Sequence, residues 1–156
     1  MDEAPDYPQV VGQYGVGLTY WYQNLDGNPP TWTNAYSCYP GLRIPTQTMS
    51  QFSGTLLENS AETGHCRSIP REVSGTVYRD GLVSFFVQDI SSGMGGCSIV
   101  GVPPAFRGAF RDEHLFASRR VSSSCAAGST LSEYSGGGPV PNAVLYQELW
   151  GDRGPL

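Results

Sequence analysis

Hydrophobic and polar positions alternate over the longest stretch near the N-terminal end of the chain. From Val10 to Tyr22 the even positions are mostly apolar or aromatic, and the odd positions up to Gln23 are mostly polar or small. A period of two residues is typical of a strand with one buried face. We therefore predict a long strand here, bent at Gly15 or Gly17, where no side chain resists curvature.

Further short extended segments follow, separated by turn residues. Asp80-Gly81 gives the best hairpin signal, because both residue types tolerate the positive φ angles of a two-residue type I′ turn. On the returning strand Val83, Phe85 and Val87 share one face. The predicted strands are 31–39, 46–57, 73–79, 82–88 and 97–102.

One segment is predicted as a helix. In 105–120, Phe106 and Phe110 are four residues apart, as on one helical face, and Pro104 suits a first helical turn. Its second part, 115–121, could instead return to a strand.

The spacing of these segments predicts the fold class. The segment 143–150 is expected to be a closing strand, although its flanking residues also allow a short helix. Roughly seven to nine strands with frequent turns predict a mostly β chain: a single-domain antiparallel β-barrel or β-sandwich with at most one or two short helices. Residues 1–8 are expected to form a loose arm before one β-rich domain, 9–156.

Composition supports a small β-rich domain and excludes two classes of partner. The 156 residues include 20 Gly and 12 Pro, which favour turns and short strands over helices. The net charge is −5 and the nine basic residues are scattered arginines, so a nucleic-acid role is not expected. No apolar run approaches the roughly 20 residues of a membrane span, so none is predicted.

Four cysteines are spread along the chain, in Gly/Ser/Pro-rich surroundings. None forms a C-x-x-C pair, so no metal site and no cofactor are predicted. Their even number favours two disulfides over four buried thiols. Three pairings are open, and similar loop lengths favour Cys38–Cys66 with Cys97–Cys125.

Cysteine usage also bears on localisation. The start Met1–Pro5 has no basic residue and no apolar stretch, which leaves a cytosolic protein or a mature secreted domain with an added methionine. Disulfides persist in oxidising compartments, so we expect a secreted, extracellular protein.

In format the chain resembles the small secreted cysteine-bridged effectors and elicitors of filamentous fungi. The features that carry the resemblance are its size, four spread cysteines, the acidic start Asp2–Pro5, and Gly/Ser/Tyr-rich strands without lysine. The resemblance implies a role in contact with a host or a cell wall. It carries over no catalytic residues.

Aromatic residues are the candidate binding residues. The alternation places Trp21 on the polar face with Gln13, Thr19 and Gln23. An exposed tryptophan on a sheet can stack on a sugar ring or anchor a protein partner, unless a loop or a second sheet covers it. Trp32 and Tyr39 are secondary candidates near the same turn.

No catalytic motif is present, so no catalytic residue is predicted. His65 beside Cys66 is an unfavourable arrangement for a nucleophilic pair, and 112–114 fits a solvated charged surface. Paired carboxylates for glycoside cleavage converge in space rather than in sequence. The candidates for such a pair are Glu58, Glu62, Glu72 and Glu148.

The leading hypothesis is a monomeric, secreted binding or recognition protein without catalytic activity, of the kind that fungi use as elicitors of plant defence. Its expected partner is a host protein receptor or a cell-wall carbohydrate. One alternative is a small secreted enzyme or an apolar-ligand-binding barrel. Another is a structural cell-wall or coat protein. In the enzyme or ligand-binding alternative, the mouth of the barrel would be lined by Arg107, Asp112, Glu113 or His114.

Overall fold

A computed structural model describes most of the chain as antiparallel sheet. The described residues are 7–26, 32–57, 70–88, 97–129, 132 and 137–156, with the backbone alone for 32–38. The strands are β1 (Gly12–Asn24), β2 (Trp32–Cys38), β3 (Gly41–Thr48), β4 (Gln51–Leu57), β5 (Pro70–Val77), β6 (Leu82–Val87), β7 (Cys97–Ile99), β8 (Phe106–Arg111), β9 (His114–Cys125) and β10 (Val140–Gly154).

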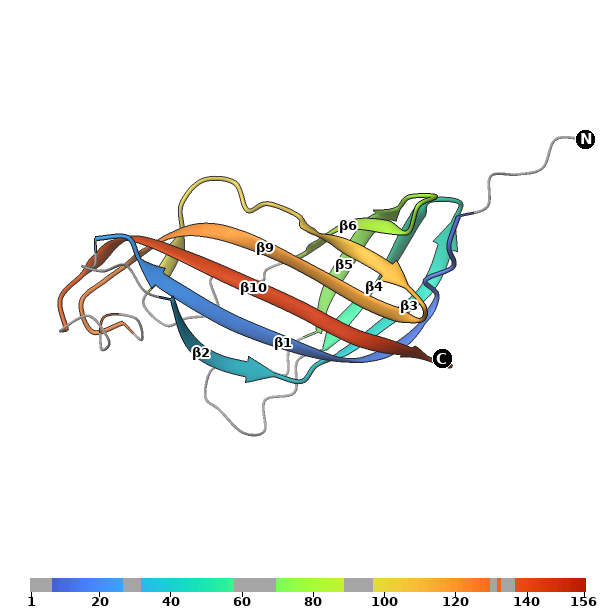
Figure 1. Cartoon of the computed structure of the whole chain (residues 1–156), viewed down its shortest axis with the longest axis horizontal. Helices are drawn as coiled ribbons and strands as arrows, with labels where there is room; N and C mark the ends of the chain where they lie inside the picture. The colour runs from blue at the N-terminus through green and yellow to red at the C-terminus, as the bar shows by residue number, and fades with distance from the viewer. Residues whose placement is uncertain (1–6, 27–31, 58–69, 89–96, 130–131, 133–136) are drawn as a thin grey trace, which may run out of the picture.

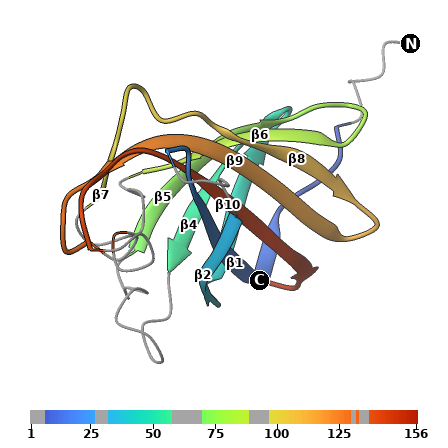
Figure 2. The same cartoon turned by 60° about the vertical axis from the view of Figure 1, so that its left-hand side comes forward.

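Eight of the described strands close into a barrel. β1, β3, β4, β5, β6, β8, β9 and β10 pair in the order of the chain, and β10 pairs with both β9 and β1 (Figures 1 and 2). The other two strands extend this wall, since β2 pairs with the second half of β1 and β7 with the end of β9. The predicted mostly β, antiparallel architecture is confirmed, as a barrel. In the described chain no helix is long and apolar enough to cross a membrane.

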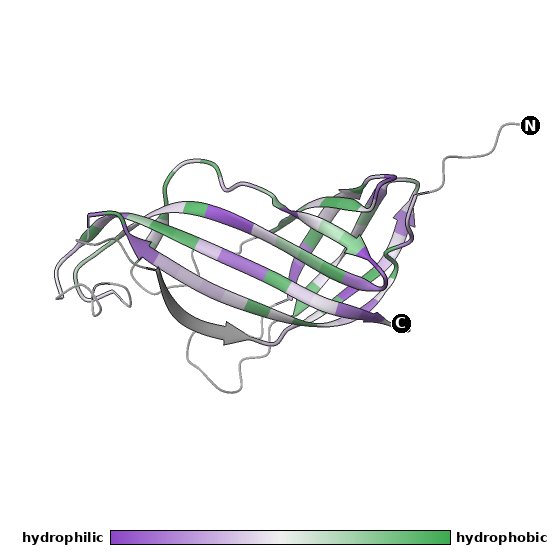
Figure 3. Cartoon of the chain, in the orientation of Figure 1, coloured by the Kyte–Doolittle hydropathy of each residue, from purple (hydrophilic) through white to green (hydrophobic). Residues whose placement is uncertain are grey.

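The alternation in the first strand sets the inside and the outside of the barrel. Tyr14, Leu18 and Tyr20 of β1 are fully buried, as the even positions predict. Hydrophobic and hydrophilic positions also follow one another along β9 and β10 (Figure 3). The period of two thus places one apolar set of side chains in the interior.

Aromatic side chains from β1, β6 and β8 pack against one another in the barrel interior. Phe85 stacks on Phe106 with ring centroids 5.3 Å apart, and Tyr14 meets Phe110 edge to face at 6.3 Å. Such pairs add about 0.5–1.5 kcal/mol to the burial of their surface. The void left beside Tyr14 and Phe85 is about 10 Å³, room for about one water molecule.

The hairpin predicted at Asp80-Gly81 is confirmed, but its turn is not the two-residue type I′ turn. The Gly81 amide donates to the Tyr78 carbonyl at 2.9 Å, and Gly81 has φ 88°. Asp80 has no positive φ; its Oδ1 accepts from the Leu82 amide at 3.1 Å. The loop is therefore longer and needs only one left-handed residue, which glycine supplies.

The helix predicted over 105–120 is wrong: this segment forms the β8–β9 hairpin. Phe106 and Phe110 both point into the barrel, because residues four apart share a face in a strand as well as in a helix. The turn residues Asp112 and Glu113 have φ 53° and 68°, so the type I′ turn lies here.

The predicted single strand 46–57 is likewise wrong. It contains the end of β3, a turn and β4, and Met49 in that turn has φ 54°. Thr48 pairs with Gln51 across the turn. Of the two turn residues, Met49 and Ser50, only the serine is common in turns, so the sequence signal for this turn is weak.

An ion pair holds the strained β8–β9 turn. Left-handed backbone costs a non-glycine residue about 1–2 kcal/mol. Arg153 of β10 donates from Nε to Glu113 Oε2 at 2.5 Å and from Nη2 to Oε1 at 2.7 Å, and its amide donates to the Glu113 carbonyl at 2.8 Å. Hydrogen bonding to Arg153 lowers the pKa of Glu113 below its usual range.

The structure confirms one of the two predicted disulfides. Cys97 and Cys125 lie opposite each other in the β7–β9 ladder and are bonded. The predicted Cys38–Cys66 pair falls outside the described residues. The observed bond fixes the short strand β7 to the long strand β9.

Replacing Cys97 and Cys125 together by alanine should lower the free energy of unfolding. The bond joins residues 28 apart in sequence. Release of that loop in the unfolded chain corresponds to about 3–4 kcal/mol at 25 °C. Urea unfolding of the oxidised proteins measures the difference; equal stabilities would show that the bond does not constrain the unfolded chain.

Glu113→Gln should make stability less dependent on acid pH. Because the folded pKa of Glu113 is lowered, its stabilising effect is complete above the unfolded value of about 4.3 and is lost as the pH falls through the folded pKa. Urea midpoints measured from neutral to acid pH should fall less steeply in the variant. Glu148→Gln, which removes one negative charge from β10 and not from the β8–β9 turn, is the control for the change in net charge. Equal slopes in the two variants would show that the pair of Glu113 and Arg153 does not contribute.

Candidate functional site

The outer face of β3 to β6 carries short polar side chains in cross-strand rows. Ser53 of β4 lies opposite Ser74 of β5, and Ser74 lies opposite Phe86 of β6. In the neighbouring row Thr55 lies opposite Glu72, whose carbonyl accepts from the amide of Gln88 at 2.8 Å. The face therefore presents hydroxyl, carboxylate and amide groups around one phenyl ring.

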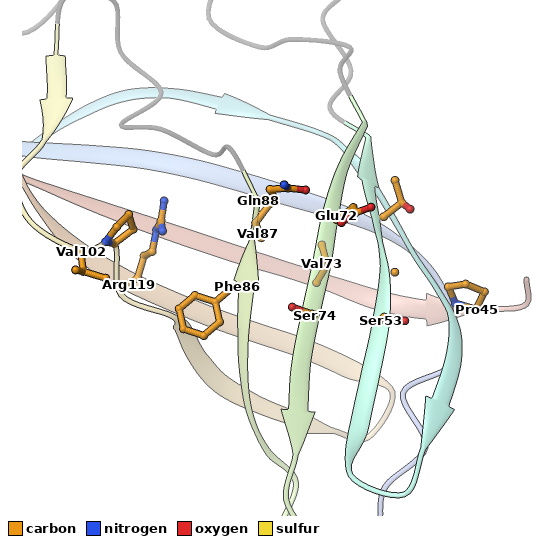
Figure 4. Close-up of a pocket in the computed structure, with 13 residues that line it drawn as sticks. Pro45, Ser53, Glu72, Val73, Ser74, Phe86, Val87, Gln88, Val102 and Arg119 are labelled. Atoms are coloured by element: carbon orange, nitrogen blue, oxygen red, sulfur yellow. The ribbon is translucent and has the colours of Figure 1, made fainter.

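A pocket of about 800 Å³ lies along this face, within the range of roughly 300–1,000 Å³ that is typical of ligand sites. Ser53, Glu72, Ser74 and Gln88 line it together with Phe86 (Figure 4). These side chains come from three adjacent strands of the barrel wall. The strand ladders thus fix the spacing of the groups that a ligand would meet.

Phe86 lies at the edge of the pocket, next to the point where the ladder between β6 and β8 ends. β6 pairs with β8 only as far as Phe85 and Phe106. Beyond this point, Val102 and Pro103 line the pocket together with Phe86. Figure 4 shows Val102 and Arg119 on the same side of Phe86. The Phe86 side chain remains 56% exposed. A phenyl ring in this position can stack on a ligand.

Arg119 contributes a positive charge to the same edge. It points inward from β9 and is 6% exposed, yet it lines the pocket. Its Nη1 donates to the Pro104 carbonyl at 3.3 Å, its Nε donates to Gln147 Oε1 at 2.5 Å, and its guanidinium lies 4.7 Å from the centre of the Phe106 ring.

Burial lowers the pKa of Arg119 to about 10, and the nearby Tyr20 acts in the opposite direction. The guanidinium therefore stays protonated at neutral pH. Its contacts with Gln147 and Pro104 fix the guanidinium in place, so it adds a positive charge to the edge of the pocket near Phe86.

The predicted binding residues do not line this pocket. Trp21 points outward, as the alternation predicts, and is half-buried on β1 opposite Tyr146 of β10. Tyr39 is exposed after β2, and the side chain of Trp32 lies outside the described residues. β1 and the β4–β6 face belong to different sides of the barrel (Figure 1).

Most of the titratable residues considered in the sequence also lie away from this pocket. Glu113 binds Arg153, and His114 Nδ1 contacts Asp152 Oδ1, both near the β8–β9 turn. Arg107, Asp112, Glu113 and His114 do not line the 800 Å³ pocket. Of the carboxylates considered for glycoside cleavage, Glu72 lines it, Glu148 lies on β10, and Glu58 and Glu62 are outside the described residues, as is His65.

Phe86 is the functional candidate that sequence reasoning missed, although a signal was present. Val83, Phe85 and Val87 were assigned to one face, which places Phe86 on the other. A phenylalanine inside an apolar run is readily taken as part of the core. The structure buries Phe85 and exposes Phe86.

Searches with the chain as a whole leave its relationships open. No protein-family model, no curated protein and no solved structure matches it. In the described part of the chain, no group of three or more His, Cys, Asp or Glu residues is placed to hold a metal ion.

Proposed function

We propose that this protein is a secreted, non-catalytic binding protein that takes a carbohydrate chain into the pocket beside Phe86. The exposed phenyl ring of Phe86, set among hydroxyl, amide and carboxylate groups, carries the proposal. The C–H face of a sugar ring stacks on an aromatic ring. Its hydroxyl groups donate to Glu72 and exchange hydrogen bonds with Ser74 and Gln88.

The outer pocket offers far more room for a ligand than the interior void beside Tyr14 and Phe85. The interior void, lined by Tyr14, Phe52 and Phe85 among others, is about 10 Å³. The outer pocket is about 800 Å³ and open to solvent along the strands. A polymer can enter such a site sideways, which suits a cell-wall polysaccharide.

Phe86→Ala should weaken binding of a soluble β-glucan or chitin oligosaccharide by about tenfold, the equivalent of 1.4 kcal/mol, because the stacking surface is lost. Isothermal titration calorimetry of the whole chain against both sugars measures the dissociation constants. Leu82→Ala, a truncation of another exposed apolar residue on the same strand, should leave binding unchanged.

Two results would count against this function. Equal affinities of the wild type and Phe86→Ala, with both proteins folded, would remove the pocket from the binding site. Shortening of the oligosaccharide during the titration, detected by mass spectrometry, would favour the enzyme alternative. Phe86 is exposed, so its replacement should change stability by less than about 0.5 kcal/mol.

Recognition by a host protein receptor, as for an elicitor, is a second proposal with its own observation. Trp21 lies opposite Tyr146 on the outer wall, and the guanidinium of Arg120 stands 5.7 Å from the centre of the Tyr146 ring. Aromatic residues and arginine are the residue types enriched at the centres of protein interfaces.

Trp21→Ala should abolish a defence response of plant tissue to the purified protein, because it removes the largest aromatic surface of this group. The response is measured as an oxidative burst in leaf discs. Phe86→Ala is the matched control and should keep the response. Loss of the response in both variants would contradict a separate receptor site on β1 and β10.

A further inference from the structure

A second outer surface, on β8, β9 and β10 near the β8–β9 turn, differs from the polar pocket face. Ala109 of β8 lies opposite Phe116 of β9, and Phe116 lies opposite Trp150 of β10. Phe116 is 47% exposed and Trp150 is 39% exposed. We call this row the apolar row. Two large aromatic side chains thus meet solvent side by side.

Trp150 packs against the neighbouring strand β1. Its six-membered ring covers Gly17 of β1, where a Cβ atom would stand 2.4 Å from Trp150 Cζ2. The ring therefore packs on bare backbone and shows its other side to solvent. Ordered exposure of this kind lowers the conformational cost of binding a partner.

Charged residues flank the apolar row: those on β8 are positive and those on β10 are negative. Arg107 and Arg111 stand on either side of Ala109 on β8, while Glu148 and Asp152 stand on either side of Trp150 on β10. The register places Ser118 between Arg107 and Glu148. One border of the surface is thus positive and the opposite border is negative.

This pattern complements a second copy of itself. When two copies pack face to face about a two-fold axis that runs along β9, the β8 border of each copy meets the β10 border of the other. Arg107 then faces Glu148 of the partner subunit, and Ala109 faces Trp150 of the partner subunit. A two-fold axis across the strands would instead place arginine against arginine, which is unfavourable.

The curvature of the barrel fits the same arrangement. The wall falls away on both sides of β9, so the two copies approach most closely at Phe116. Long side chains are needed to bridge the wider gap at the borders, and arginine, glutamate and tryptophan stand there. Small alanine opposite large tryptophan adds a match in volume.

We propose that the chain forms a homodimer through the apolar row, with the two-fold axis along β9 at Phe116. From the sequence alone a monomer is expected. The apolar row and its charged borders cannot be recognised there, because they form only when β8, β9 and β10 are placed in register. The Arg107–Glu148 pair is the one to test. Asp152 already contacts His114, and Arg111 donates to the Asp80 carbonyl at 3.4 Å.

The test is a charge exchange followed by sedimentation velocity of the whole chain at concentrations up to about 1 mM. The wild type should sediment with twice the chain mass of 16.8 kDa at the highest concentrations. Glu148→Arg alone, and Arg107→Glu alone, should each raise the dissociation constant at least about tenfold by opposing like charges. The double variant should restore association, since each border is then matched again.

Matched controls separate the interface from folding. Met49→Ser replaces an exposed apolar residue in the turn between β3 and β4, away from β8, β9 and β10, and should leave the dissociation constant unchanged. Circular dichroism verifies that each variant retains its sheet. A wild type that stays at 16.8 kDa throughout, or a folded double variant no better than the single ones, overturns the proposal.

Discussion

Closure of the barrel through β10 is the constraint on which the other features depend. β10 is hydrogen-bonded on one side to β1 and on the other to β9, so it joins the two ends of an otherwise sequential meander. A closed wall leaves inward positions in the core and outward positions in solvent for every strand. The ion pair between Arg153 and Glu113 adds to this closure, because it ties the end of β10 to the β8–β9 turn.

The two proposed surfaces both arise from the way neighbouring strands place their outward side chains next to one another. Each outward position takes its neighbours from the strands on either side, so residues distant in sequence form compact groups. On β4 to β6 these groups are polar and surround Phe86, whereas on β8 to β10 they are aromatic with charged borders. A single wall therefore carries two surfaces of different chemistry without any change in its core.

Sequence patterns predicted a mostly β barrel or sandwich, the inward face of β1 and the position of the β5–β6 hairpin. They failed at 105–120, because Phe106 and Phe110 satisfy both a helical and a strand period. They also missed Phe86, because a phenylalanine inside an apolar run is readily taken as part of the core, although the alternation of β6 places it on the outer face. The rows on the outer wall could not be predicted, because they follow from strand register, which short turns such as Asp112-Glu113 set.

The pairing of the first strand with the last has a consequence for connectivity. Gln13 lies opposite Gly154 in the ladder, so the entry to β1 and the exit from β10 are adjacent on the wall. Each of the eight barrel strands is hydrogen-bonded to a neighbour on both sides, so the ladders alone do not determine which strand comes first in the chain. A circular permutation that joins these two points and opens the chain at the turn at Gly81 would keep every strand beside its present neighbours.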